Sequence, residues 1–175
     1  MDLTKYEKIF TQESEKYLEE LDRLLICVEK DPSKLDLWAE IHGKAHSIKS
    51  MARALRFEKI STLSHAMEEW CKGFQEGEME PQPNAIQLIF QGTDMLRLLV
   101  ARMDEIDSAE AQNLYDTLIC QFRKGPKAWA AESDTGEPPP LSNRSSAKGL
   151  KYVRVKYSLI EELLGISREI LFFEN

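Results

Sequence analysis

Apolar residues recur at steps of three and four along the first 125 positions of the chain. This is the spacing of one face of an α-helix, and no stretch before residue 125 alternates apolar and polar residues as a half-buried strand does. Prolines and glycines interrupt the pattern and divide it into five helices. We therefore expect an all-α fold, namely an antiparallel four-helix bundle with a fifth helix. The positions expected to face the core are Tyr6, Ile9, Phe10, Tyr17, Leu21, Leu24, Leu25 and Val28, then Trp38, Ile41, Ala45, Ile48, Ala52 and Leu55, then Ile60, Leu63, Met67, Trp70 and Phe74, then Ile86, Ile89, Phe90, Leu96, Val100 and Met103, and finally Leu114, Leu118 and Phe122.

The composition changes after residue 125. Pro138, Pro139 and Pro140 stand among Ser, Asn, Gly and Lys, and such a segment cannot bury enough apolar surface to offset the entropy of ordering it. Ser158 then has the position of a helix cap, and an apolar side follows within 158–175. We expect this helix to be disordered, or to pair with a second copy of the chain or with a neighbouring bundle. The expected parts are a helical bundle over 1–125, a flexible linker over 126–149 and a C-terminal amphipathic helix over 150–175.

The charge and hydropathy of the chain argue against a nucleic-acid or membrane partner. It carries 23 Lys and Arg against 30 Asp and Glu, a formal net charge of −7, whereas nucleic-acid binding relies on Lys and Arg that neutralise phosphates. The longest uncharged stretch, residues 81–93, is far shorter than the ~20 apolar residues of a membrane span, and the N-terminus has no signal segment. We expect a cytoplasmic protein with no membrane insertion and no nucleic-acid partner. Its three cysteines, Cys27, Cys71 and Cys120, are expected to be reduced and to lie in the helical core.

All three histidines fall on the second and third expected helices. His42, His46 and Lys49 are spaced i, i+4 and i+7, so they form one stripe, which is displaced by one residue, about 100°, from the apolar row of their helix. On the next helix, His65 and Glu68 are displaced from the core row in the same way. Because the polar flanks of packed helices meet along a seam, we expect His46, Lys49, His65 and Glu68 to come together at the surface of the bundle.

Such a group suits phosphoryl transfer. A neutral imidazole, whose pKa is ordinarily ~6.5, is a competent nucleophile near neutral pH. A carboxylate that accepts the hydrogen of one ring nitrogen leaves the lone pair of the other nitrogen free to attack. We expect His46 to be the nucleophile, Glu68 to orient its imidazole, Lys49 to offset the charge of the phosphoryl group and His65 to be a further hydrogen-bonding neighbour.

Two other interpretations stay open on these residues alone. His42 and His46 could bind zinc together with His65 or Glu68, although the sequence has no His-Glu-x-x-His motif. Alternatively, the histidines could be ordinary surface residues, with Glu68 paired to Lys72, in a helical bundle that acts only as an interaction module.

The segment Ala45-His46-Ser47-Ile48-Lys49-Ser50, continuing through Leu55 and Phe57 to His65-Ala66-Met67-Glu68, resembles the histidine phosphotransfer (HPt) domain that opens the chemotaxis histidine kinase CheA. The resemblance covers about residues 1–125. It implies that His46 accepts a phosphoryl group, with Lys49, His65 and Glu68 around it. Ser50, Arg53 and Arg56 stand near positions where that family has glycine, and they are candidates for contacts with a docking partner. The tail from Val153 to Asn175 is similar to the start of the dimerisation domain of the same kinase.

The resemblance also implies the partners. One is the ATP-binding domain of a kinase, which would supply the phosphoryl group. The other is the receiver domain of a response regulator, which would take it. No cofactor is expected in this chain, because ATP and Mg²⁺ would be bound by the partner domains. The chain would then be the phosphoacceptor portion of a histidine kinase and could not phosphorylate itself with ATP.

Overall fold

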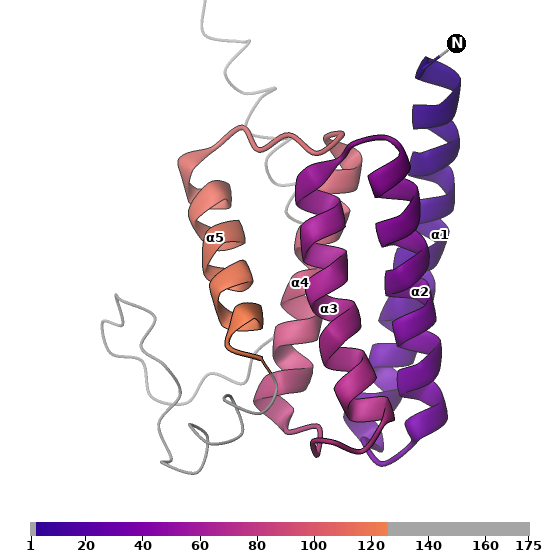
Figure 1. Cartoon of the computed structure of the whole chain (residues 1–175), viewed down its shortest axis with the longest axis vertical. Coiled ribbons are helices and arrows are strands. Elements are labelled where there is room, and N and C mark those ends of the chain that lie inside the picture. The colour runs from indigo at the N-terminus through magenta and orange to yellow at the C-terminus, as the bar shows by residue number, and fades with distance from the viewer. Residues whose placement is uncertain (1–2, 126–175) are drawn as a thin grey trace, which may run out of the picture. The chain divides into compact units, whose positions relative to one another are not determined.

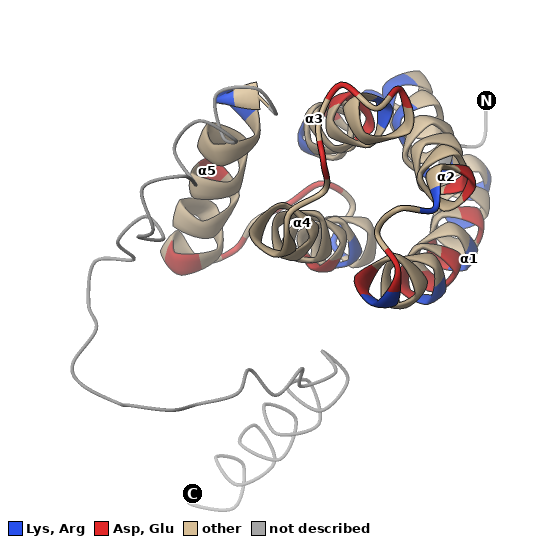
Figure 2. Ribbon diagram, turned by 90° about the horizontal axis from the view of Figure 1, so that it is seen from below, with Lys and Arg blue, Asp and Glu red and all other residues tan. Residues whose placement is uncertain are grey.

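The computed structural model describes residues 3–125, and these residues form five α-helices and no strand. The helices are α1 (Leu3–Lys30), α2 (Leu35–Ala54), α3 (Glu58–Gln75), α4 (Pro83–Ala101) and α5 (Ala109–Arg123). Helices α1 to α4 run up and down beside one another, and α5 packs against α3 and α4 (Figure 1). Seen end-on, the four form a closed ring with α5 outside it (Figure 2). The expected all-α bundle with a fifth helix is confirmed, whereas the expected linker and C-terminal helix lie outside the described residues.

Helices α2 and α3 present the core faces that their spacing predicted. The rows that begin at Trp38 and at Ile60 are fully buried, except that Leu55 is half-buried. The aromatic rings of the two helices meet, with the centroids of Trp38 and Phe74 4.5 Å apart. Because each buried row fixes the rotation of its helix, the residues that follow it by one position must lie at the edge of the helix.

Other predictions of burial were wrong. Tyr6 and Ile9 are exposed, and the first turns of α1 extend past the end of α2 (Figure 1). In α5 the predicted Leu114 is exposed, and its neighbour Tyr115 is buried instead. Of the three cysteines only Cys71 lies in the core, while Cys27 and Cys120 are exposed.

An indole hydrogen bond and a glycine at a close approach help to hold helix α5 against the bundle. Trp70 Nε1 donates to the carbonyl oxygen of Phe122 at 2.9 Å, and the two rings meet edge to face with centroids 5.7 Å apart. A Cβ on Gly92 of α4 would lie 2.8 Å from Met67 Sδ and 3.1 Å from Phe122 Cζ. Glycine therefore allows α3, α4 and α5 to approach one another at this level.

The start of α3 is capped from a distant part of the chain. Asp104, in the loop after α4, accepts from the backbone N–H of Ile60 at 2.7 Å and from that of Lys59 at 3.0 Å. The carboxylate thereby satisfies two backbone donors that a helix N-terminus leaves without intrahelical partners. Asp104 reaches this position with φ 70°, in the left-handed region that Asp tolerates better than most residues. This contact fixes the first turn of the helix that carries Glu68.

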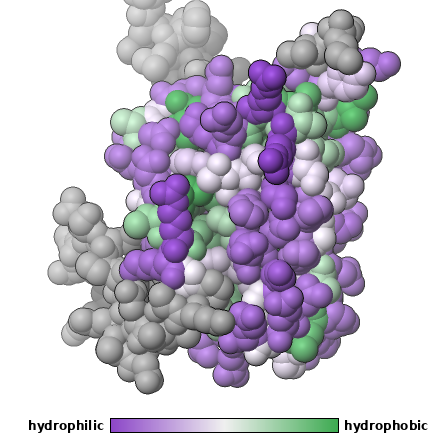
Figure 3. Space-filling model, in the orientation of Figure 1, coloured by the Kyte–Doolittle hydropathy of each residue, from purple (hydrophilic) through white to green (hydrophobic). Residues whose placement is uncertain are grey.

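The face of the bundle over α2 and α3 is mostly hydrophilic, with only small apolar patches (Figure 3). Within residues 3–125, no helix combines the length and the apolar character that a membrane span requires.

Candidate functional site

The candidate site lies on the seam between α2 and α3, the two helices that contact each other most extensively. His42, His46 and Lys49 follow one another along the edge of α2, and Glu68 faces them from α3. Each lies one residue after a buried residue, namely Ile41, Ala45, Ile48 and Met67. The sequence therefore places these side chains at the seam through its core rows, without any special backbone geometry.

The central contact joins His46 and Glu68. His46 Nδ1 lies 2.9 Å from Glu68 Oε1. The side chain of His46 is 54% exposed, while that of Glu68 is only 11% exposed. Because an ionised carboxylate can only accept hydrogen bonds, this contact places the ring hydrogen on Nδ1 and the lone pair on Nε2. The imidazole is thus held from the inner side, and its nucleophilic nitrogen is left for an incoming group.

Lys49 completes the charge balance of the seam. Its Nζ lies 2.5 Å from Glu68 Oε2, and its side chain is largely buried. Burial of the Glu68 carboxyl would by itself raise its pKa, but the hydrogen bond from His46 and the ion pair with Lys49 outweigh burial, so that the pKa of Glu68 is lowered. The carboxylate therefore stays ionised near neutral pH and remains an acceptor for His46.

The structure gives the other two histidines different surroundings. His65, which was expected to join the group, is exposed and lies with Nε2 3.7 Å from Glu69 Oε1. It precedes Glu68 by three positions and so points about 60° away from it around the helix. His42, whose role the sequence left open, has its Nε2 3.7 Å from Glu68 Oε1. Its i, i+4 spacing from His46 was the signal that could have placed it beside the same carboxylate.

Ser50, Arg53 and Arg56 are all exposed on α2 and the turn that follows it. Neither guanidinium forms an ion pair with any residue in the described part of the chain. Arg56 has φ 63°, a left-handed conformation that glycine adopts without strain and that costs an ordinary residue about 1–2 kcal/mol. The three residues therefore form an open polar surface beyond the His46 stripe.

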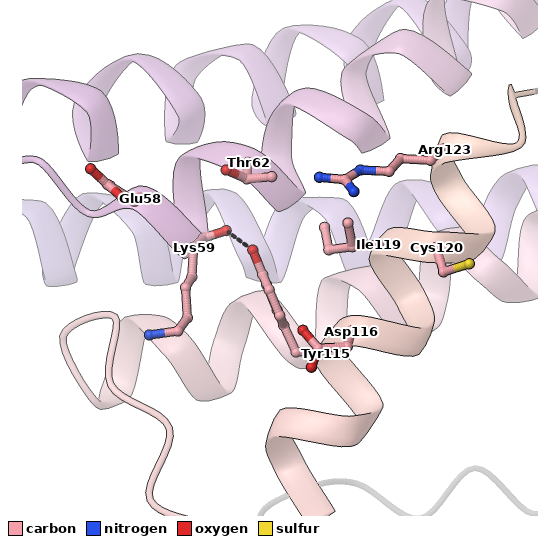
Figure 4. A pocket seen from close by; sticks show the side chains of 8 residues that line it. All are labelled: Glu58, Lys59, Thr62, Tyr115, Asp116, Ile119, Cys120 and Arg123. Atoms are coloured by element: carbon pink, nitrogen blue, oxygen red, sulfur yellow. Dashed lines mark hydrogen bonds between the residues drawn. The ribbon is translucent and has the colours of Figure 1, made fainter. Parts of the chain in front are cut away.

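The described residues also contain a hollow of ≈ 430 Å³ between α3 and α5, away from the candidate site (Figure 4). Tyr115 points into it and donates to the carbonyl oxygen of Lys59 at 3.3 Å, and burial raises the pKa of this phenol to about 12. None of the sequence-predicted site residues lines it. Over residues 3–125, no three His, Cys, Asp or Glu side chains are grouped in a way that could hold a metal ion.

Comparison with known proteins identifies a family that the chain matches. The family model described as Hpt domain matches residues 6–109. Curated relatives include the chemotaxis protein CheA of Bacillus subtilis (strain 168), 26% identical over 163 residues that make up 93% of this chain and 23% of the relative. CheA of Halobacterium salinarum is 31% identical over 103 residues, 59% of this chain and 15% of the relative. The chain therefore spans less than a quarter of the length of these two relatives.

Two solved structures are similar to the bundle. The CheA phosphotransferase domain from Thermotoga maritima matches with a TM-score of 0.56 and 26% identity, over 60% of this chain and 99% of that one. A solution structure of the histidine phosphotransfer domain of CheA matches in fold with a TM-score of 0.60 and 24% identity, over 69% of this chain and 90% of that one. Since the family model covers more than half of the chain, including both helices of the His46–Glu68 seam, this chain belongs to the Hpt domain family.

Proposed function

We propose that this chain carries phosphoryl groups in a chemotaxis-type two-component pathway, and that His46 is the residue that bears them. The observation that carries the proposal is the contact of 2.9 Å between His46 Nδ1 and Glu68 Oε1 on a ring that is 54% exposed. It orients the ring and leaves Nε2 available to a phosphoryl donor. The names of the relatives, chemotaxis protein CheA, support the pathway.

The chemistry uses the two ring nitrogens differently. The lone pair of Nε2 attacks the γ-phosphorus of ATP that a kinase domain holds, so that an N–P bond forms and the P–O bond to ADP breaks. The hydrogen on Nδ1 stays between the ring and Glu68, and the carboxylate offsets the positive charge that develops on the imidazole. In the second step an aspartate oxygen of a receiver domain attacks the same phosphorus, and the N–P bond breaks. ATP and Mg²⁺ belong to the partner domains in this scheme.

The remaining groups have supporting roles. The Lys49 ammonium lies beside Glu68 and reduces the repulsion that an acidic protein exerts on phosphoryl oxygens. His65 is exposed three positions before Glu68 and lies beside Glu69, so a hydrogen bond from it to a phosphoryl group on His46 would require its side chain to turn toward the seam. Ser50, Arg53 and Arg56 would dock the receiver domain, because exposed guanidinium groups without an internal partner favour an acidic pocket.

Two further parts of the proposal concern the whole protein. A pathway of this kind places the chain in the cytoplasm, in contact with a kinase domain and a receiver domain. Pairing with a second copy of the chain through 158–175 also remains a proposal, since that segment lies outside the described residues.

Labelling with radioactive ATP tests the central assignment. The full chain is mixed with [γ-³²P]ATP and the purified ATP-binding domain of a chemotaxis kinase, and the label is mapped by mass spectrometry at alkaline pH. We expect stoichiometric, acid-labile label on His46, and none on the His46→Gln variant. Label that persists at full stoichiometry in this variant would remove His46 from the mechanism. A wild-type chain that takes up no label would favour the interaction module.

A further inference from the structure

A second imidazole lies beside the Glu68 carboxylate and has no part in the proposed transfer. His42 Nε2 is 3.7 Å from Glu68 Oε1, the same oxygen that His46 Nδ1 contacts at 2.9 Å. The two rings are one helical turn apart, with centroids separated by 6.4 Å and planes tilted by 32°. The side chain of His42 is 28% exposed, so that it can exchange protons with water.

The other charged groups near His42 have their own partners. These ionic contacts are Lys49 with Glu68, Lys44 with Glu20 on α1, and on α3 His65 with Glu69 and Lys72 with Glu76. In the described part of the chain, Glu68 is the one carboxylate within ion-pair distance of His42. His42 and His46 therefore share a single acceptor.

Two imidazoles that share one carboxylate bind protons as a coupled pair. The first proton forms an ion pair with Glu68 whichever ring takes it. A second proton would place two positive charges side by side, and their repulsion resists it. Protonation of the two rings has different effects on phosphoryl transfer. A proton on His46 Nε2 occupies the lone pair that must attack phosphorus, whereas a proton on His42 leaves that lone pair free.

We propose that His42 is a positioning residue that takes up part of this first proton and thereby keeps His46 neutral and nucleophilic below neutral pH. The inference rests on the proposed function, since it assigns to His42 a role only through His46. The proton comes from water and returns to water, so the transfer chemistry at Nε2 is unchanged. His42 thus extends the range of pH over which His46 accepts a phosphoryl group.

Nuclear magnetic resonance measures this coupling directly. The ring nitrogens of His46 are followed in the full chain from about pH 5 to about pH 8.5, in wild type and in the variants His42→Gln and His42→Lys. Glutamine keeps a polar side chain but takes up no proton, so the midpoint of the His46 titration should rise. Lysine holds a permanent positive charge, so the midpoint should fall. The midpoints of the two variants should differ by about 0.5 pH unit, the effect of one charge at this distance in water-like surroundings, with that of wild type between them. A purely structural contribution of His42 would move both variants in the same direction or not at all, and either result overturns the proposal.

The labelling assay over the same range separates this inference from the proposed function. The acid limb of the initial rate should move to higher pH in His42→Gln and to lower pH in His42→Lys, together with the titration midpoints. If wild type is never labelled, the proposed function fails while the titration still reports on His42. If His46 is labelled and the acid limb of His42→Gln coincides with that of wild type, the inference about His42 fails. Circular dichroism at each pH shows that the variants stay folded.

Discussion

The first turn of α3 and the middle of α3 use polar side chains in opposite ways. At the first turn, both polar side chains form hydrogen bonds with the backbone. The Asp104 carboxylate accepts from the N–H groups of Lys59 and Ile60, and the Tyr115 hydroxyl donates to the C=O of Lys59. At the middle, the Glu68 carboxylate gathers side chains of α2 and leaves His46 Nε2 with no partner within the described residues. The first arrangement satisfies the backbone and therefore stabilises the fold. The second leaves one nucleophilic atom facing solvent, where another molecule can approach it.

The sharpest way to break this contrast is Glu68→Gln, for which we expect the largest effect. The amide keeps the size of the side chain but has no charge to hold the Nδ1 hydrogen or to offset the charge that develops on the ring. The initial rate of His46 phosphorylation should fall by about 100-fold, the upper end of the effect of removing a group that orients a reacting ligand. The free energy of unfolding should fall by about 1–3 kcal/mol, because the largely buried Lys49 ammonium is left without its charged partner. Labelling rate and urea unfolding measure the two quantities.

The adjacent carboxylate provides a matched control for this variant. Glu69 is exposed and lies near His65 rather than near His46. Glu69→Gln removes the same charge from the same helix, and it should leave the labelling rate within about twofold of wild type. A similar loss of rate in both variants would mean that the general charge of α3 matters, and that the contact with His46 does not.

The reverse experiment acts on the first turn of α3. Asp104→Gly removes both acceptors of the cap and tolerates the left-handed backbone at this position, where relief of strain and the extra freedom of the unfolded chain act in opposite directions, so the loss of the cap dominates its effect. The free energy of unfolding should fall by about 1–2 kcal/mol, as for the loss of other helix caps. Asp104→Asn keeps one side-chain oxygen and should lose about half as much. In the folded fraction the labelling rate should equal that of wild type, and a rate that falls with stability would contradict the division between the two regions.

The seam could be predicted from sequence because its placement follows from local rules. The rows of α2 and α3 are unbroken, so the rotation of each helix is fixed by burial, and residues one position later must face the edge. Two helices joined by a short turn pack antiparallel, which brings the level of His46 to that of Glu68. His65 lies beside Glu69 and outside the group, a side-chain placement that helical spacing alone does not decide.

The other features depend on distant contacts that leave no local signal. The cap of α3 comes from Asp104, which follows Ile60 by 44 residues and belongs to a different loop. Tyr6 and Ile9 continue the apolar row of α1, but burial requires a neighbour, and the contact between Phe10 and Phe57 lies near the end of the shared bundle. In α5, both Leu114 and Tyr115 satisfy the helical spacing. The hydrogen bond from Tyr115 to α3 favours burial of the tyrosine.

Arg56 is expected to show the smallest effect, and it tests whether the α2 end of the seam serves a partner. Arg56→Gly relieves the left-handed strain at φ 63°, and the extra freedom of glycine in the unfolded chain offsets part of the gain. The free energy of unfolding should therefore rise by about 0.5–1 kcal/mol. The variant also loses an exposed positive charge, so binding to the receiver domain of a chemotaxis response regulator should weaken several-fold at low salt and by less at high salt.

Arg53→Gln removes a charge without changing the backbone, and it should weaken binding while leaving the free energy of unfolding unchanged. A more stable Arg56→Gly chain that binds the receiver domain as wild type does would show that Arg56 contributes nothing to docking.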